Sequence, residues 1–449
     1  MAGQGTDDRP LAGVRVFELS IAIAGPTCGR YLAHFGADVI RAESRRNPDP
    51  VRVIGSAWVP MDDPSIGDAR PDTSPMVNEY SAGKRCIGLD LKTDGGREVA
   101  RRLLPTCDVF LTNYSGPALK DLGLDYEGVR ALRPDVIYVA MHAFGAVEDA
   151  PYYDYVAWGP NQAPLTGLDD LTGYPGEAPA AIAAFGYPDY SSGLYAVLAT
   201  CAALEWRDRT GEGQLCDVSQ FEATVSLLGP ILLDHERNDT TPARMGNRLE
   251  WSAPEGVYPC SGDDRWVAIS AYSEEAWRAL AEVAGHPEWL ADTRFFDMAA
   301  RVANHDALDE VLSDWTRNHT ADEVATWLQA AGVAAGPVMD PPAILADTHV
   351  AQRGFWLTGA HARVGEDLVT GNAIKLHDTP GWIERAGPSL GEDNADVLGD
   401  VCGYTDEEQQ ALVDAGAVFP MAAPDLSLQR PYRAWAPAAF PHLPWSRGS

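Results

Sequence analysis

The stretch that decides the fold is VRVFELSIAIAGPTCGRYLAHFGADVIRAE, at residues 14–43. Its first six residues form an apolar run typical of a buried strand, and a turn with Pro26 near the start of a helix follows. Residues 38–43 predict a second strand. A strand, a helix and a second strand in this order indicate the start of a Rossmann-type parallel sheet. The turn lacks the G-x-G-x-x-G pattern, so a dinucleotide cofactor is poorly supported.

The α/β alternation continues after this unit. We expect helices at 95–104 and 126–132, and buried strands at 108–112 and 136–143. At 148–173 the alternation gives way to a loop-rich segment in which aromatic residues surround Asp154. A carboxylate embedded among aromatic side chains has a raised pKa, which suits handling a proton or orienting an anion.

The next organised stretch is FGYPDYSSGLYAVLATCAALEWRDRTGEG, at residues 185–213. Its apolar residues have helical spacing, and cations followed by glycine mark the end of the helix. Asp189 comes directly before the helical run and has two interpretations. It is either the helix N-cap, or a carboxylate that the helix dipole keeps ionised and that acts as a nucleophile. Local pattern does not decide between them. A short strand at 214–218 and a helix from Gln220 follow.

From about residue 244 the pattern becomes that of a smaller α+β domain. A hairpin is expected at 257–270, and helices at 274–283, 305–316 and 321–331. Strand and helix signals at 371–376, 387–399 and 405–415 would rejoin the first domain. We therefore expect a large Rossmann-like domain at 1–225, a linker and small α+β domain at 226–345, a return segment at 346–418 that completes the large domain, and a Pro/Ala/aromatic tail at 419–449 without a core of its own.

Composition narrows the function classes. A net charge of −31 argues against nucleic acid or an anionic membrane as a partner. With 45% hydrophobic residues, no long apolar run and no signal-peptide pattern, a cytoplasmic location is expected. Seven scattered cysteines without metal-ligand spacing predict reduced thiols and no metal site. Because lysine is rare, the adjacent Lys84 and Arg85 are candidate phosphate contacts, with a solvated strand entry as the alternative.

Several segments, in order, resemble family III CoA-transferases, a family that also includes the α-methylacyl-CoA racemases. The matching segments are LAGVRVFELS…AGPTCGRYLAHFGADVIRAE, SAGKRCIGLDLKTDGGREVARRLLPTCDVFLTNYSGPALKDLGL, RPDVIYVAMHAFG, WGPNQAPLTGLDDLTGYPG, YPDYSSGLYAVLATCAALEWRDRTGEGQLCDVSQFEA, RMGNR and KLHDTPGW…AGPSLGED. Each is weak alone, but the ordered set, from about residue 11 to about residue 416, is specific.

The resemblance implies that Asp189 forms covalent acyl intermediates and that Asp154 lines the acyl pocket. The residues implied to contact CoA or adjoin the active site are Lys84, Asn113, Tyr114, Tyr153, and Arg45 or its neighbour Arg46. CoA thioesters would then be substrates, with no permanently bound cofactor. The resemblance also implies an interlocked, ring-like homodimer. Some relatives pair two different subunits, so a heteromeric partner is the alternative.

Three features depart from the family pattern. Ile23 stands where formyl-CoA transferases have glutamine, which argues against oxalate as the acceptor. Asp121 replaces a basic CoA contact, for which neighbouring Lys120 is the available substitute. The glycine-only loop of formyl-CoA transferases has no equivalent at 244–258.

The leading prediction is transfer of CoA from an acyl-CoA to a free carboxylic acid through aspartyl anhydride and aspartyl-CoA thioester intermediates. One alternative is α-methylacyl-CoA epimerisation, with Asp154 and His142 as acid and base. The racemases, however, have a His-Asp step where this chain has Tyr153-Asp154, and the complete YPDYSSG element favours transfer. The other alternative is a non-catalytic CoA-binding subunit, against which the intact Asp189 argues. Ile23 and the aromatic residues at 152–158 favour an acid bulkier or less polar than oxalate.

Overall fold

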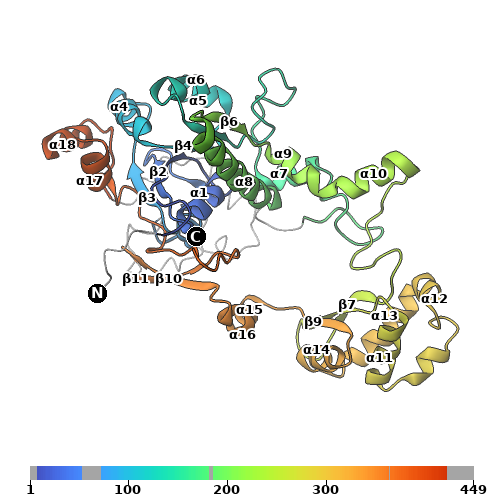
Figure 1. Cartoon of the computed structure of the whole chain (residues 1–449). Helices are drawn as coiled ribbons and strands as arrows, with labels where there is room; N and C mark the ends of the chain where they lie inside the picture. The colour runs from blue at the N-terminus through green and yellow to red at the C-terminus, as the bar shows by residue number, and fades with distance from the viewer. Residues whose placement is uncertain (1–7, 53–71, 182–185, 364, 422–449) are drawn as a thin grey trace, which may run out of the picture. The chain divides into compact units, whose positions relative to one another are not determined.

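The computed structural model describes residues 8–52, 72–181, 186–363 and 365–421 (Figure 1). Internal contacts divide the chain into two compact units. One comprises Met1–Thr166, Ile182–Pro230 and Gln352–Ser449, and the other Gly167–Ala181 and Ile231–Ala351. Within the described ranges, no helix has the length and apolar character needed to cross a membrane. All but the first three residues of the predicted tail, 419–449, lie outside the described residues.

The first unit is built on a six-stranded sheet in the order β3-β2-β1-β4-β5-β6, and every neighbouring pair is parallel. Its strands are β1 (Arg15–Leu19), β2 (Asp38–Glu43), β3 (Arg85–Gly88), β4 (Val109–Thr112), β5 (Ile137–Ala140) and β6 (Gln214–Asp217). This order is that of the Rossmann fold. The prediction of an α/β fold with a Rossmann-type parallel sheet is therefore confirmed.

Helices cover both faces of this sheet (Figure 1). The helices of this unit are α1 (Ala24–His34), α3 (Pro75–Tyr80), α4 (Asp94–Leu103), α5 (Gly116–Leu122), α6 (Tyr126–Leu132), α7 (Gly159–Leu165), α8 (Tyr187–Thr210), α9 (Gln220–Val225), α17 (Asn394–Asp396) and α18 (Asp406–Asp414). Helix α10 (Gly229–Asn238) belongs to the second unit from its third residue on. Successive residues of β1 point to opposite faces. Val16 packs in a core with residues of α1 and α8, whereas Phe17 packs in a core with residues of α4, α6 and the 397–418 region. Both faces are buried, which explains the continuous apolar runs in the strands.

A hairpin of β10 (Trp356–His361) and β11 (Gly365–Thr370) belongs to the same unit and was not predicted. The strand signal at 371–376 is wrong, because the strand ends at Thr370. Two local hydrogen bonds explain why the strand ends at this residue. The hydroxyl of Thr370 is held by Arg30 at 2.6 Å, and the side chain of Asn372 accepts a hydrogen bond from the backbone of Ile374 at 2.8 Å. Such a bond from an asparagine to the backbone two residues on favours a turn over a strand.

The second unit has an antiparallel sheet of β7 (Glu255–Pro259), β8 (Trp266–Ser270) and β9 (Ala334–Pro337). The helices that bury its core are α11 (Glu274–Ala284), α12 (Met298–Ala303), α13 (His305–Thr316) and α14 (Ala321–Ala330); α15 (Pro341–Ala346) and α16 (Thr348–Gln352) lie at or near its C-terminal end. The predicted hairpin and three of the helices are present. Sequence periodicity missed β9, whose four residues include one glycine, one proline and no β-branched residue.

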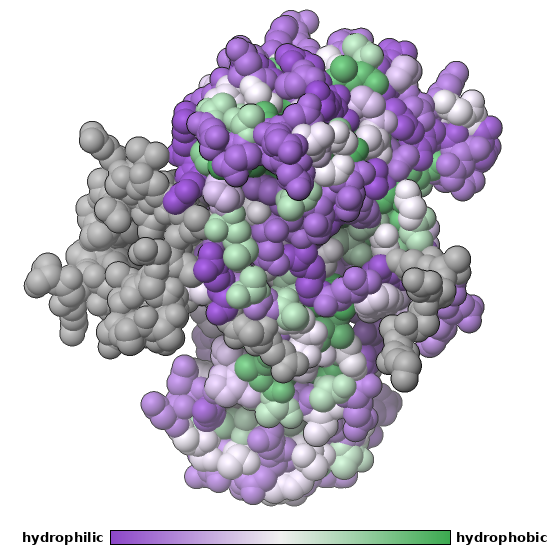
Figure 2. Space-filling view, turned by 90° about the vertical axis from the view of Figure 1, so that its left-hand side faces the viewer, coloured by the Kyte–Doolittle hydropathy of each residue, from purple (hydrophilic) through white to green (hydrophobic). Residues whose placement is uncertain are grey.

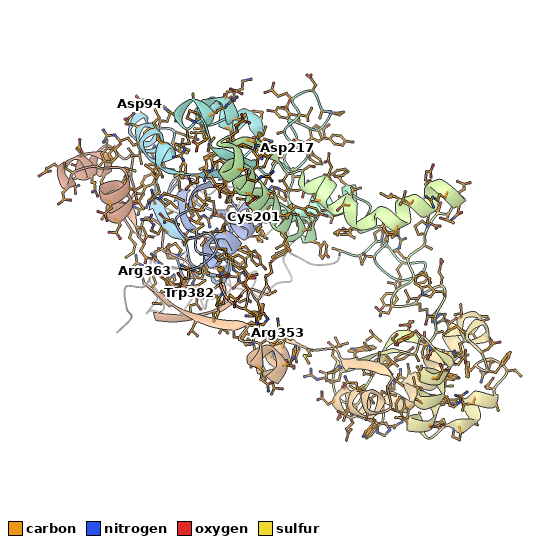
Figure 3. All side chains as sticks on the ribbon, in the orientation of Figure 1. Asp94, Cys201, Asp217, Arg353, Arg363 and Trp382 are labelled. Carbon is orange, nitrogen blue, oxygen red and sulfur yellow. The ribbon has the colours of Figure 1, made fainter. Side chains whose placement is uncertain are left out.

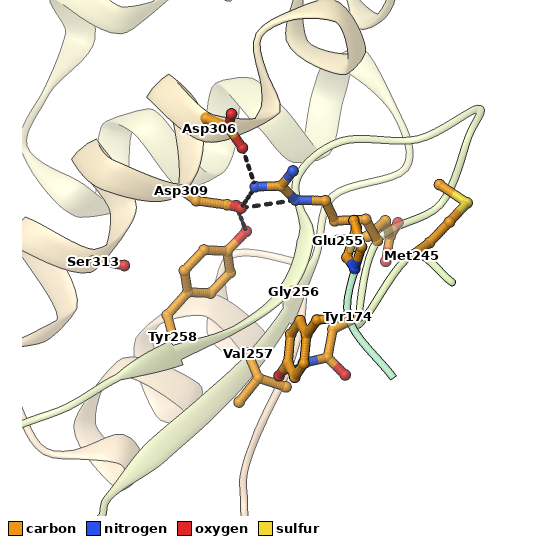
Figure 4. Close-up of a pocket in the computed structure, with 12 residues that line it drawn as sticks. Tyr174, Met245, Glu255, Gly256, Val257, Tyr258, Asp306, Asp309 and Ser313 are labelled. Atoms are coloured by element: carbon orange, nitrogen blue, oxygen red, sulfur yellow. Dashed lines mark hydrogen bonds and ion pairs between the residues drawn. The ribbon is translucent and has the colours of Figure 1, made fainter. Parts of the chain in front are cut away.

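A cavity of about 340 Å³ in this unit shows why the RMGNR segment matters to its structure (Figure 4). Arg248 donates to Asp306 at 2.7 Å and to Asp309 at 2.6 Å, and the hydroxyl of Tyr258 donates to Asp309 at 3.0 Å. These bonds pair the guanidinium with two carboxylates. These hydrogen-bonded side chains connect the RMGNR segment, through Arg248, to α13 and β7.

On the face that Figure 2 shows, hydrophilic side chains cover most of the area, and hydrophobic ones form small groups between them. Scattered groups of this size are normal for a folded chain.

Candidate active site

Asp189 lies in the first turn of α8, but it is not the N-cap. The N-cap is Gly186, Asp189 is the third helical residue, and no side-chain cap bond is present. The N-cap interpretation is therefore wrong. The reason is Pro188: its fixed φ and missing N–H are accommodated in a first helical turn, so the helix begins before the aspartate rather than after it.

The carboxyl group of Asp189 is nearly removed from solvent. The residue is 9% exposed, and burial raises its pKa to about 7, with only its own backbone N–H acting in the opposite direction. No charged neighbour among the described residues contributes to this shift. Asp189 is thus a desolvated acid that can exchange a proton near neutral pH.

A cavity of about 260 Å³ lies beside Asp189. Its lining residues are Ile21, Ala22, Asn47, Asn113, Tyr114, Ser115, Ala118, His142, Ala143, Phe144, Tyr153, Tyr155, Val156, Ala157, Trp158, Asp189 and Gln220. Ile21, Asn113 and His142 follow β1, β4 and β5 respectively. The cavity therefore opens at the carboxyl ends of these strands, where the strand order reverses between β1 and β4. This is the position at which open α/β sheets bind ligands.

Two side chains fix the loop after β1 that forms one wall of the cavity. Asn113 accepts a hydrogen bond from the backbone N–H of Ile21 at 2.9 Å and donates to its carbonyl at 2.8 Å. The carboxylate of Asp49 accepts from the N–H of Ala22 at 2.9 Å. Ala22 has φ 58°, a left-handed conformation that a non-glycine residue adopts only when its surroundings hold it. These bonds therefore hold the loop that forms this wall in one conformation before a ligand binds.

A buried cluster of charges supports this wall. Arg41 bonds to Asp49, and Arg52 bonds to Glu43 at 2.7 Å and to Asp72 at 2.9 Å. These side chains are at most 3% exposed. Burial raises the pKa of Asp49, and Arg41 opposes that shift; for Glu43, burial is outweighed by Arg41 and Arg52, which lower its pKa. Removing one partner would leave a buried charge less well paired, so each member of the cluster contributes to the stability of this wall.

The segment after β5 is anchored from β6. Asp217, labelled in Figure 3 at the end of β6, accepts hydrogen bonds from the N–H of Ala146 at 3.0 Å through both carboxylate oxygens. Phe144, just before this anchor, lines the cavity and packs against Tyr152 and Tyr155. The predicted aromatic segment therefore forms a second wall.

The two cations predicted near CoA have different surroundings. Lys84 is completely buried: its Nζ lies 2.7 Å from Glu18 and donates to the carbonyl of Pro26 at 2.9 Å. Burial lowers its pKa to about 8, opposed by Glu18. This burial argues against direct contact between Lys84 and a phosphate. Arg45 is partly exposed, but its Nε is buried and has no hydrogen-bond partner among the described residues. Nearby Asn47 lines the cavity.

The other predicted residues divide between the cavity and its surroundings. Asn113, Tyr114 and Tyr153 line it, and burial raises the pKa of Tyr114. Asp154 is exposed and does not line it, although Tyr153 and Tyr155 on either side do. The expectation that Asp154 is embedded among aromatic side chains is wrong for the described chain, because Tyr152 and Tyr155 pack on Phe144 and leave Asp154 facing outward.

Two residues named with the departures from the family pattern, Ile23 and Lys120, lie close in sequence to residues that line the cavity. Ile23 is 7% exposed and follows the lining residues Ile21 and Ala22. Lys120 is exposed, with its Nζ 3.7 Å from Glu148, and Ala118 on the same helix lines the cavity.

Sequence reasoning missed several lining residues, among them Asn47 and Gln220. Gln220 follows β6 and donates to the carbonyl of Met141 at 2.9 Å. A polar residue shortly after a parallel strand was the available signal, the same one that applies to Asn113. Within the ranges the structure describes, no cluster of three His, Cys, Asp or Glu residues could hold a metal ion.

Comparison with known proteins decides the family. The family model described as CoA-transferase family III matches residues 11–394. The chain belongs to CoA-transferase family III. It is 31% identical over 419 residues to the succinyl-CoA–D-citramalate CoA-transferase of Chloroflexus aurantiacus, covering 92% of this chain and 98% of that one. It is 29% identical over 405 residues to the succinyl-CoA–L-malate CoA-transferase beta subunit of the same organism, covering 90% and 96%.

A solved structure shares the fold. A CAIB/BAIF family protein from Brucella suis superimposes with a TM-score of 0.78 and 30% identity, covering 88% of this chain and 99% of that one. The family III CoA-transferase described here is therefore an enzyme whose substrates are CoA thioesters.

Proposed function

We propose that this enzyme transfers CoA from an acyl-CoA to a free carboxylic acid, with Asp189 as the nucleophile. The position of Asp189 supports this best. Its carboxyl group is almost fully buried and lies at the wall of a cavity that opens at the carboxyl ends of three parallel strands. A carboxylate that has lost its hydration shell attacks a thioester carbonyl more readily than a solvated one.

The reaction then has two symmetrical halves. The Asp189 carboxylate attacks the thioester carbonyl and expels CoA thiolate, which leaves a mixed anhydride. The thiolate attacks the aspartyl carbonyl, releases the donor acid and forms an aspartyl-CoA thioester. The acceptor acid repeats these steps in reverse. Covalent catalysis divides one difficult exchange into steps of similar free energy.

We assign the CoA contacts to Arg45, Asn113, Tyr114 and Tyr153. Three of them line the cavity, and Arg45 is a partly exposed cation two residues before the lining residue Asn47. Asp154 stays a candidate for orienting the acyl end from the rim beside Tyr153. Lys84 would act indirectly, by holding Glu18 of β1 beneath the loop that forms the cavity wall.

We propose further that the active form is a dimer. Helix α8 exposes apolar side chains along its length: Tyr187, Leu194, Tyr195, Leu198 and Trp206 are 43–67% exposed. Cys201, labelled on α8 in Figure 3, is exposed too. A helix that is apolar on all sides is normally buried. The similarity to a transferase named as a beta subunit leaves a second, different chain as the alternative partner. Light scattering after size exclusion distinguishes a dimer from a monomer.

The decisive experiment combines a substrate panel with detection of the intermediate. Donors such as succinyl-CoA and acetyl-CoA are incubated with a set of monocarboxylic and dicarboxylic acids, and new thioesters are detected by mass spectrometry. With acyl-CoA alone, the wild-type peptide containing Asp189 should gain the mass of an acyl or CoA group. The same peptide from Asp189→Asn should not. A wild-type enzyme that transfers CoA without such an adduct contradicts the proposal.

Epimerisation is the second candidate, because His142 and Asp189 line the same cavity. Burial lowers the pKa of His142, which leaves a neutral imidazole able to accept a proton. An epimerase would exchange the α-hydrogen of a 2-methylacyl-CoA with heavy water in the absence of any free acid. A transferase would not.

A further inference from the structure

Two glycines surround one oxygen of the Asp189 carboxyl group. Gly159 is the first residue of α7, and Gly186 is the N-cap of α8. A β-carbon on either residue would overlap Oδ2 of Asp189. A β-carbon on Gly159 would also overlap the backbone of Gly186, and the reverse holds as well. We call Gly159 and Gly186 the glycine seat.

The glycine seat makes the two oxygens of the carboxyl group inequivalent. Oδ2 lies against main-chain atoms of two helix starts, which cannot move aside as the end of a flexible side chain can. Gly186 also has φ 41°, in the left-handed region that favours glycine. Asp189 as a whole still lines the cavity, so its other oxygen is the one available to a substrate.

We propose that the glycine seat holds Oδ2 in place throughout the catalytic cycle, so that only Oδ1 forms and breaks bonds with acyl groups. Gly159 and Gly186 are then positioning residues for the nucleophile. This inference rests on the proposed aspartyl mechanism and adds which oxygen takes part.

The path of each oxygen follows from the bonds that break. Oδ1 attacks the donor carbonyl and becomes the bridging oxygen of the anhydride. When CoA thiolate attacks the aspartyl carbonyl carbon, the bond from that carbon to Oδ1 breaks, and Oδ1 leaves with the donor acid. Oδ2 remains as the carbonyl oxygen of the aspartyl thioester.

The acceptor then replaces the missing atom. Its carboxylate attacks the aspartyl carbonyl and expels CoA thiolate, which forms the second anhydride. The thiolate attacks the acceptor's own carbonyl carbon, and the bond from that carbon to the bridging oxygen breaks. The bridging oxygen stays on Asp189. Each turnover therefore replaces one aspartyl oxygen with an oxygen from the acceptor acid.

Isotope labelling tests the glycine seat directly. The wild-type enzyme is run for many turnovers with a donor and acceptor pair that transfers CoA, for example succinyl-CoA and succinate carrying heavy oxygen in all carboxyl positions. The mass of the peptide containing Asp189 is then measured by mass spectrometry. We expect its label to stop at one heavy oxygen. Two heavy oxygens would show that the carboxyl group turns over, and the seat would be rejected. No label in an enzyme that forms product would reject the aspartyl mechanism, and the seat with it.

A matched pair of variants gives the second test. Gly159→Ala places a methyl group where Oδ2 lies, and we expect the transfer rate to fall roughly a hundredfold while the dissociation constant of the acyl-CoA stays unchanged. Gly229→Ala is the control, because Gly229 is also the first residue of a helix and a β-carbon there would meet nothing within 4 Å. A folded Gly159→Ala enzyme with the wild-type rate would overturn the proposal. The label count is measured on the wild type, so it does not depend on the folding of any variant.

Discussion

Lys84 and Glu18 form an ion pair from which solvent is fully excluded. Nζ lies 2.7 Å from Oε2, and neither side chain is exposed. Because Nζ also donates to the carbonyl of Pro26, the pair links β1 to α1. The scarcity of lysine in the sequence marked Lys84 as a phosphate contact, whereas its surroundings make it part of the core.

Replacing Lys84 should therefore affect stability first. Lys84→Met removes the nearest cation from the buried Glu18 carboxylate, which among the described residues then keeps only Arg41, at 3.9 Å, and the hydroxyl of Ser20. Removing one member of a buried ion pair costs up to about 3–5 kcal/mol. Urea denaturation measures this loss. The double variant Glu18→Gln/Lys84→Met should recover part of it, because the group that lost its nearest cation is then neutral, and Arg41 keeps its ion pair with Asp49. A Lys84→Met enzyme of unchanged stability but weaker CoA-thioester binding would restore the direct phosphate contact.

We expect Arg45, rather than the buried Lys84, to contact a CoA phosphate. If its guanidinium binds a CoA phosphate, Arg45→Ala should weaken CoA-thioester binding by about 1–3 kcal/mol through loss of a charge-assisted hydrogen bond. Isothermal calorimetry with a non-hydrolysable thioester measures this. Arg46→Ala is the matched control, because Arg46 is exposed and its guanidinium is paired with Asp90 at 3.1 Å. An equal loss of CoA-thioester affinity in the two variants would show that Arg45 does not contact CoA.

The raised pKa of Asp189 predicts an acidic limit to activity. In the proposed mechanism the nucleophile is the ionised carboxylate, and burial raises the pKa of Asp189 to about 7. The rate of CoA release in a single turnover should therefore fall tenfold per pH unit well below about pH 7 and level off above it. Rapid-quench measurements from about pH 5 to about pH 9 give this profile. A rate independent of pH across this range would be incompatible with a carboxylate nucleophile of this pKa.

The sheet was predictable because its signals are local. Val16 and Phe17 point to opposite buried faces, so the strand reads as a continuous apolar run, and β1, β2, β4, β5 and β6 were all expected within a few residues of their positions. The short strand β9 has no such pattern. Its pairing with β8 is a tertiary contact that periodicity does not record.

The site was predictable only in part, because burial depends on packing contacts that the spacing of residues does not record. Asp189, Asn113 and Tyr114 share a cavity because they lie in the first turn of α8 or directly follow β4. The burial of Lys84 depends on Glu18, which is 66 residues away (84 − 18). The exposure of Asp154 depends on the packing of Tyr152 and Tyr155 against Phe144. The first relationship lies outside any local window of sequence, and the second lies within a loop-rich segment that has no periodicity from which to predict it.

Asp189→Asn should separate stability from activity. The folded-state pKa of about 7 lies above the ordinary value of 3.8, so the native protein holds a proton that the unfolded chain has lost between these values. Wild-type stability therefore falls as pH rises from about 4 to about 7, by an upper bound of roughly 4 kcal/mol, and stays low above that range. Asparagine carries no such charge, so the variant should unfold at higher urea concentration than the wild type at about pH 8 and at a similar one at about pH 4.

Transfer of CoA by Asp189→Asn should nevertheless fall by several orders of magnitude, because an amide cannot form the anhydride. Asp208→Asn, at an exposed aspartate of the same helix, is the control and should change neither property. An Asp189→Asn enzyme that transfers CoA at a near-normal rate would refute the assignment of the nucleophile. A variant that is no more stable than the wild type at about pH 8 would instead show that Asp189 is better solvated than its burial indicates.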